Sequence, residues 1–168
     1  MDDALMLRLR VEELLFEEAD LIDSWQLEKW LTLFTEDAEY LVPPSDIDGD
    51  TADPATSLFY VMDDRKRMEE RVIRLAKVGA HSEQPRSKVR HIVGNVRVRR
   101  AQVNGVDRVH ARSSFFVSRA KDVTADMFIG HYLHELVEVA DGGLKIAKKT
   151  CVLDMEALRP HARISIIL

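Results

Sequence analysis

The sequence has very few of the residues that build disulfides, phosphate-binding loops and membrane spans. A single cysteine, Cys151, excludes an internal disulfide and fits a reducing compartment. None of the seven glycines belongs to a Gly-rich loop that could hold a phosphate or a dinucleotide. No apolar run approaches the roughly 20 residues of a membrane span, and the acidic start Met1-Asp2-Asp3 is unlike a secretory signal. We therefore expect a cytoplasmic protein that does not enter a membrane.

The charges are present but unevenly placed. Residues 1–64 hold 18 acidic and 3 basic side chains, whereas residues 86–121 hold 10 basic and 1 acidic. The basic residues alternate with Val, Ile and Phe in strand-like runs, without an aromatic platform on which bases could stack. This pattern favours contact with an acidic protein surface, on this chain or another, over contact with nucleic acid.

Apolar residues with a spacing near 3.6 dominate the first half of the chain. They predict three helices, over residues 4–22, 24–35 and 63–77. Asp23 is predicted to cap the second helix, with Gln26 as its capping-box partner. Asp63 or Asp64 is predicted to cap the third.

The second half of the chain alternates with a period of two. The sequence predicts short strands over residues 39–42 and 57–61, an exposed loop at 45–55, and long strands over 88–102, 108–119, 127–140 and 144–154. Asn104-Gly105 and Asp141-Gly142-Gly143 are typical hairpin turns, so the four long strands should form an antiparallel meander. Gly94 and Gly130, isolated within strands, are candidates for bulges that bend the sheet.

Helices followed by a meander indicate an α+β fold in one domain over residues 1–168. The predicted layout has helices at about 4–35 and 63–77, the main antiparallel sheet at about 86–154 and a C-terminal tail at 155–168. The N-terminal helices should pack on one face of a strongly curved sheet. Such a sheet forms a cone with a pocket between sheet and helices.

A cone pocket could support acid–base chemistry. Its candidate catalytic residues are His91, His131, Asp37 and Tyr40. A histidine beside a carboxylate could remove a proton next to a carbonyl, as a stand-alone isomerase, dehydratase or cyclase would require. The structural alternative is that Asp37 caps a turn, Tyr40 belongs to the core and His91 is hydrogen-bonded at an interface.

The run His131-Tyr132-Leu133-His134-Glu135 has the residue types of a metal site but the wrong spacing. On a strand, His131 and His134 point to opposite faces, while His131 and Glu135 lie roughly 13 Å apart. We therefore predict no metal site here. A Rieske 2Fe-2S cluster needs two cysteines and two histidines, which one cysteine cannot supply.

Three stretches give the chain a recognisable family pattern. The first is Phe16 to Asp23 with Trp30-Leu31 and Asp37 to Tyr40, and the second is Asp63-Asp64 with Met68, Arg71, Val72 and Leu75. The third and most specific is Pro-Arg-Ser-Lys-Val-Arg-His-Ile-Val-Gly-Asn-Val over residues 85–96. On these residues the chain resembles the small (beta) subunit of aromatic-ring-hydroxylating dioxygenases, with Pro-Arg-Ser-Lys in place of the commoner Pro-Pro-Ser-Arg.

The resemblance implies a fold like that of nuclear transport factor 2, and a non-catalytic, structural small subunit without a cofactor of its own. It implies that a separate large (alpha) subunit holds a Rieske 2Fe-2S cluster and a mononuclear iron, with electrons from NAD(P)H through a reductase. The large subunit would add O2 to an aromatic ring to give a cis-dihydrodiol, in aromatic catabolism. The typical assembly has three large and three small chains.

The resemblance also changes the expected role of the charged run. Instead of catalysis, it implies contacts with other subunits. The interface residues that we predict are Arg86, Lys88, Arg90, His91 and Asn95. Their charges would meet carboxylates or backbone carbonyls of another chain, because a buried charge is tolerated only when it is paired.

Overall fold

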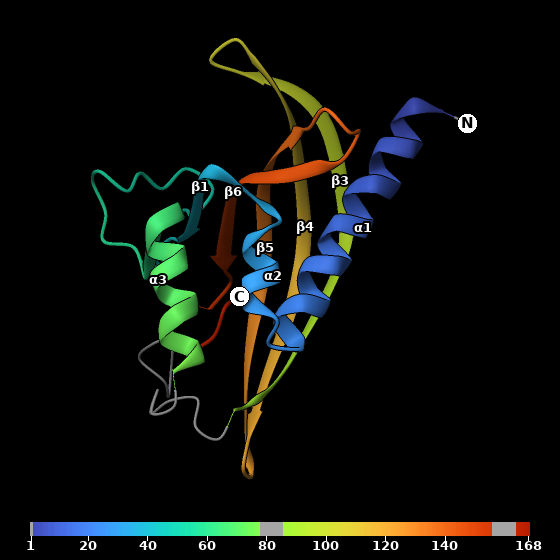
Figure 1. The fold of residues 1–168 in the computed structure, drawn as a ribbon. Helices are drawn as coiled ribbons and strands as arrows, with labels where there is room; N and C mark the ends of the chain where they lie inside the picture. The colour runs from blue at the N-terminus through green and yellow to red at the C-terminus, as the bar shows by residue number, and fades with distance from the viewer. Residues whose placement is uncertain (1, 78–85, 156–163) are drawn as a thin grey trace.

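The computed structural model describes residues 2–77, 86–155 and 164–168 and has the predicted α+β architecture (Figure 1). The helices are α1 (Asp3–Asp23), α2 (Leu27–Leu31) and α3 (Arg65–Ala76), and the strands are β1 (Phe34–Val42), β2 (Val61–Asp64), β3 (Lys88–Val103), β4 (Val106–Lys121), β5 (Thr124–Glu138) and β6 (Leu144–Leu153). Pro85 and most of the predicted tail, residues 156–163, lie outside the described residues. Within the described part, no helix is both long and apolar enough to cross a bilayer.

One six-stranded sheet carries the whole fold, in the order β2-β1-β6-β5-β4-β3. The antiparallel meander of the four long strands is confirmed. Its first turn has positive φ at Asn104 (52°) and Gly105 (76°), and its last turn has positive φ at Gly142 (82°), as the sequence predicts. The sequence did not predict that β1 joins β6 in parallel and thereby extends the meander into a larger sheet.

The helices lie on one face of the sheet, which we call the inner face (Figure 1). Alternate residues of β4 and β5 point toward the helices and are buried there, for example Phe115, Val117 and Tyr132. The rings of Trp30 and Phe34 meet edge to face, with their centroids 4.8 Å apart. The inner face packs into the hydrophobic core. Because side chains alternate along a strand, the residues between these buried ones point to the opposite, outer face.

The N-terminal helices differ from the prediction in one place. The second helix is a single short element, α2, and the chain is already extended from Phe34, so the predicted helix over 24–35 is too long. Asp23 does not cap it: Asp23 is the last residue of α1, and its carboxylate accepts hydrogen bonds from His91 instead. A long-range partner therefore outcompeted the local cap. Asp64 caps α3 as predicted, by accepting from the backbone N–H of Arg67 at 2.9 Å.

The two strand glycines have different roles. The register of β3 against β4 shifts between Gly94 and Arg97, and Asn95 has a positive φ of 54°, which confirms a bulge there. At Gly130 the register is regular and the bulge prediction is wrong. A β-carbon at Gly130 would lie 1.9 Å from the carbonyl oxygen of Val152, so the glycine permits close approach of β5 and β6.

The predicted short strands are shifted along the chain. The strand expected at 57–61 forms at Val61–Asp64, and the one expected at 39–42 begins at Phe34. The segment between them, including residues 45–55, is a loop as predicted.

Candidate functional site

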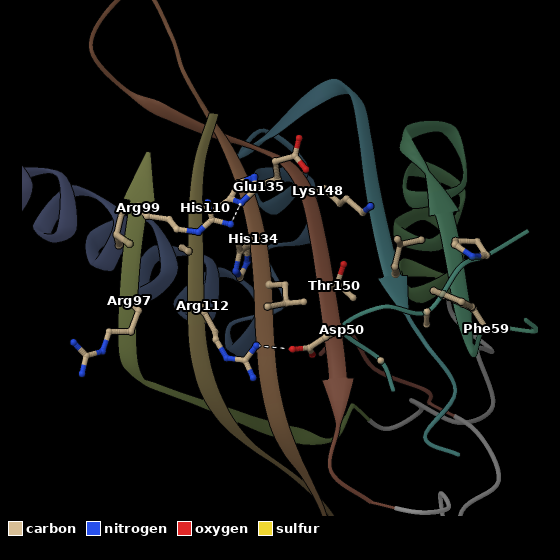
Figure 2. A pocket seen from close by; sticks show the side chains of 17 residues that line it. Asp50, Phe59, Arg97, Arg99, His110, Arg112, His134, Glu135, Lys148 and Thr150 are labelled. Carbon is tan, nitrogen blue, oxygen red and sulfur yellow. Dashed lines mark hydrogen bonds and ion pairs between the residues drawn. The ribbon is translucent and has the colours of Figure 1, made fainter. Parts of the chain in front are cut away.

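The outer face of the sheet carries a pocket of about 550 Å³ (Figure 2). Its floor is built by β3, β4, β5, β6 and β1, and one wall is the loop between β1 and β2. In Figure 2 the helices lie behind the strands, so this pocket is separate from the core. Its size is within the range of small-molecule sites.

The loop is held onto the sheet through Asp50. Its carboxylate accepts from Arg112 at 2.7 Å and lies 2.5 Å from His131 Nε2. Partial burial raises the pKa of Asp50, but the hydrogen bonds from Arg112 and His131 outweigh burial and hold it below its usual range. Beside Asp50, Gly49 packs so closely on Val152 that a β-carbon would lie 2.6 Å from its Cγ1 atom.

Four basic side chains form a compact block at one end of the pocket. Arg97 of β3 is directly opposite Arg112 of β4, and Arg99 is directly opposite His110. Arg99 donates to His110 Nδ1 at 3.0 Å, so His110 carries its proton on Nε2. Within the described residues, His110 Nε2 has no hydrogen-bond partner, and Arg97 has neither an ion pair nor a side-chain hydrogen bond. We call these four residues the basic block.

A row of exposed apolar side chains crosses the same face farther along the strands. Ile92, Phe116 and Ile129 are cross-strand neighbours on β3, β4 and β5 and are 60%, 36% and 43% exposed. Met127 of β5 is 53% exposed beside them. We call these four residues the apolar row. Grouped exposed apolar residues of this kind mark an interaction surface.

The inner face contains a buried charged network that the sequence did not reveal. The Glu18 carboxylate accepts from Lys149 Nζ at 2.7 Å, Trp30 Nε1 at 3.1 Å and His134 Nε2 at 3.3 Å. Lys149 also donates to the carbonyl oxygen of Leu168 at 2.6 Å. All the charged groups are almost fully buried. The sequence hinted only that His134 points inward, because it alternates with the apolar residues Tyr132 and Leu136 on the same face of its strand.

Burial sets the protonation of this network. Burial would raise the pKa of Glu18, but the charge of Lys149 and the hydrogen bonds from His134 and Lys149 hold it far below its usual range. Burial lowers the pKa of His134, more than Glu18 raises it. His134 is therefore neutral, with its proton on Nε2 facing Glu18.

His91 also has its partners inside the chain. Its backbone N–H and Nδ1 face the Asp23 carboxylate at 2.9 and 2.6 Å, and Nε2 lies 3.1 Å from the carbonyl oxygen of Ile167. These contacts join the end of α1, the start of β3 and residues 164–168. A buried His91 with both ring nitrogens occupied has a structural role in the single chain.

The four candidate catalytic residues do not form one site. His91 pairs with Asp23, while Asp37 accepts from the Thr35 hydroxyl at 2.8 Å. The Tyr40 hydroxyl accepts from the backbone N–H of Leu168 on the inner side, and burial raises its pKa well above the usual value. His131 faces the outer side, where it meets Asp50. The expected His/Asp pair of a cone pocket is therefore absent among these residues.

The predicted interface residues lie at two places. Lys88, Arg90 and Asn95 are exposed on β3, at the open edge of the sheet and beside the apolar row. Arg86 is exposed next to the helices, with its guanidinium 5.3 Å from the centre of the Trp25 ring. Four of the five side chains are thus accessible to another chain, and their role at an interface stays a prediction.

The metal-like run behaves as its strand geometry predicts. His131 meets Asp50 on the outer face and His134 meets Glu18 on the inner face, which confirms that the two histidines point apart. Residues 2–77, 86–155 and 164–168 contain no group of three His, Cys, Asp or Glu side chains that could hold a metal. Burial raises the pKa of Cys151 to about 12, so its thiol stays protonated.

Comparison with known proteins adds the family context. The family model described as "Ring hydroxylating beta subunit" matches residues 17–160. The chain is 47% identical to the small oxygenase component of the p-cumate 2,3-dioxygenase system of Pseudomonas putida. That match covers 98% of this chain and 89% of the relative.

Solved structures share the fold at low sequence identity. A chain of naphthalene 1,2-dioxygenase with indole bound in its active site matches with a TM-score of 0.83 at 18% identity, over all of this chain and 88% of that chain. An NTF2-like protein with a cystatin-like fold from Novosphingobium aromaticivorans matches with a TM-score of 0.58 at 20% identity, over 96% and 94% of the two chains. The fold like that of nuclear transport factor 2 is thereby confirmed.

Proposed function

The chain belongs to the ring-hydroxylating beta-subunit family, and on this premise we propose that it is the structural, non-catalytic half of an oxygenase assembly. It is the small subunit of a ring-hydroxylating dioxygenase, so it acts as part of an enzyme complex. The large subunit is its main partner. We propose further that other copies of this chain complete an assembly of three large and three small subunits in the cytoplasm.

The oxygen chemistry belongs to the partner in this proposal. The single, buried and protonated Cys151 does not fit a Rieske cluster, and the inner face is occupied by core side chains. The Rieske cluster and the mononuclear iron would therefore be in the large subunit, with NAD(P)H supplying electrons through a reductase. Because the p-cumate relative is 47% identical, a substituted benzoate is the ring to test first.

The outer face supports the docking role. The apolar row is exposed in the single chain, and the cations of Lys88 and Arg90 border it on β3. An apolar centre with a charged rim is the usual composition of a protein interface. The edge strand β3 also leaves backbone groups available to a neighbour, and its charged side chains prevent unspecific pairing. This exposed row is the observation that carries the proposed contact.

Co-purification tests the assembly. The chain and a Rieske-type large subunit, produced together, should form a brown complex that oxidises an aromatic ring, whereas this chain alone should be colourless and inactive. The mass of the complex measures the number of subunits. Turnover by the isolated chain would instead support a stand-alone isomerase, dehydratase or cyclase.

A matched pair of variants tests the surface. Ile92→Asp places a charge in the apolar row, while Ile73→Asp does the same on α3 at nearly equal exposure, 57% against 60%. We expect Ile92→Asp to reduce recovery of the complex, and Ile73→Asp to leave it unchanged. Equal recovery of the two variants would show that the apolar row is not a subunit contact.

A further inference from the structure

The outer pocket has two chemically different ends. The basic block occupies the β3–β4 end. The other end is lined by the apolar residues Leu133, Leu41, Phe59 and Pro54, together with Lys148 and Thr150 of β6. Figure 2 shows Arg97 and Arg99 on one side of the pocket and Phe59 on the opposite side. Three strand spacings separate β4 from β1 in the sheet order, about 14 Å along the sheet.

The basic block carries more positive charge than the carboxylates paired with it carry negative charge. Arg97 and Arg112 are direct cross-strand neighbours of like charge, an arrangement that destabilises a sheet unless an anion lies between them. Asp50 pairs with Arg112 at 2.7 Å, and Arg99 donates one hydrogen bond to Nδ1 of His110. Arg97 and the Nε2–H of His110 keep their donors free among the described residues. The nearby carboxylate of Glu135, directly opposite His110, is already paired with Arg108 at 3.4 Å, so among the described residues Arg97 still lacks an acceptor.

We propose that the outer pocket binds a small amphipathic carboxylate, with its carboxylate on the basic block and its apolar body along Leu133 toward Phe59. Guanidinium groups match the planar, two-oxygen geometry of a carboxylate. The length of the pocket suits a body of about two fused rings. The loop that carries Asp50 and Phe59 would cover the ligand. This accessory site goes beyond the structural role and needs no group of the large subunit.

The test uses 2-naphthoate and the full chain. Titration followed by ¹⁵N NMR should give saturable shifts at residues of β3, β4 and the β1–β2 loop. The neutral analogue 2-naphthamide lacks the charge and acetate lacks the rings, so both should bind about tenfold more weakly or not at all. Rising salt should also weaken 2-naphthoate binding.

Two variants separate binding from folding. Arg97→Gln removes an exposed cation that has no ion pair within the described part of the chain, and should weaken 2-naphthoate binding by about tenfold without lowering the melting temperature. The matched control, Arg67→Gln, removes an exposed arginine of α3 and should leave binding unchanged. Phe59→Ala should also weaken 2-naphthoate binding, because it removes apolar contact with the rings.

Three results would overturn the proposal. The first is the absence of saturable shifts, and the second is equal binding by Arg97→Gln and Arg67→Gln. The third is strong protection of the β1–β2 loop from hydrogen exchange when the large subunit binds without any added carboxylate. That protection would mean that a partner segment, rather than a small molecule, fills the pocket.

Discussion

Replacing Lys149 with methionine tests whether the buried network on the inner face stabilises the fold. The Lys149 side chain is 1% exposed and its ammonium contacts both the Glu18 carboxylate and the carbonyl oxygen of Leu168. Methionine has a similar length, so the variant removes a charge and two hydrogen bonds rather than volume. Glu18 would remain buried, 3% exposed, with only Trp30 and His134 as donors.

Breaking a buried ion pair by removing one partner costs about 3–5 kcal/mol, because the other charge stays in the core. The two remaining donors of Glu18 place the expected loss near 3 kcal/mol, which lowers the melting temperature of a domain of this size by roughly 10 °C. Chemical unfolding of Lys149→Met in urea measures this loss. Lys66→Met, on the exposed face of α3, is the matched control and should change the stability by less than about 0.5 kcal/mol.

The pH dependence of the stability loss in Lys149→Met shows whether the loss comes from the charge of Glu18. In the native protein the pKa of Glu18 is lowered, so its contribution is complete above the unfolded pKa, about 4.3, and is lost as the pH falls. Without Lys149, burial dominates and raises that pKa, so Glu18 can take up a proton in the folded state. The stability difference between native protein and Lys149→Met should therefore shrink from pH 7 to pH 5.

The double variant Glu18→Gln/Lys149→Met tests whether the loss comes from the unpaired charge of Glu18. It removes both charges, so it should recover most of the stability that Lys149→Met loses. A loss below about 1 kcal/mol for Lys149→Met, or a loss of the same size at pH 7 and pH 5, would contradict this role of Lys149. Either result would mean that Glu18 is not held as a carboxylate by Lys149.

Three further substitutions test other parts of the fold. Because the pKa of His134 is lowered in the folded protein, its contribution to stability is full above about pH 6.5 and is lost as the pH falls through the folded pKa. The free energy of unfolding of His134→Gln, measured in urea, should therefore change less between pH 7 and pH 5 than that of the native protein. In thermal unfolding, Gly130→Ala should cost about 3 kcal/mol or prevent folding, because its methyl group would meet a carbonyl oxygen of β6. Gly94→Ala, with open space around it, should cost much less in the same assay. His91→Phe should cost about 2 kcal/mol and speed hydrogen exchange in the C-terminal residues that His91 holds; unchanged exchange would contradict that role.

The elements that the sequence predicts well are those specified by local patterns. The long strands alternate strictly, and Asn104-Gly105 is a turn because both residues accept positive φ. The cap of α3 was also local, since Asp64 and Arg67 are three residues apart. In each case the deciding interaction lies within a few residues.

The elements that the sequence misses depend on distant partners. Asp23 resembles a cap, but His91, 68 residues away, takes its carboxylate. Glu18 and Lys149 are 131 residues apart, and each would be expected on the surface by composition. The sequence shows that the residues of the basic block are basic, but not that they lie opposite one another in two cross-strand pairs. That pairing depends on the register of β3 against β4, which the bulge after Gly94 sets.

The contrast between the two faces bears on the stand-alone enzyme hypothesis. Proton abstraction next to a carbonyl needs a cavity in which a base reaches the substrate. On the inner side the predicted base His91 is occupied, since it binds Asp23 and Ile167. A cavity of about 10 Å³ beside Trp25 and Ile166 has room for at most one water molecule. A substrate could use His91 as a base only by displacing Asp23 or the carbonyl oxygen of Ile167 from its ring nitrogens. The outer face needs no such rearrangement, so partner contact and ligand binding are both expected there.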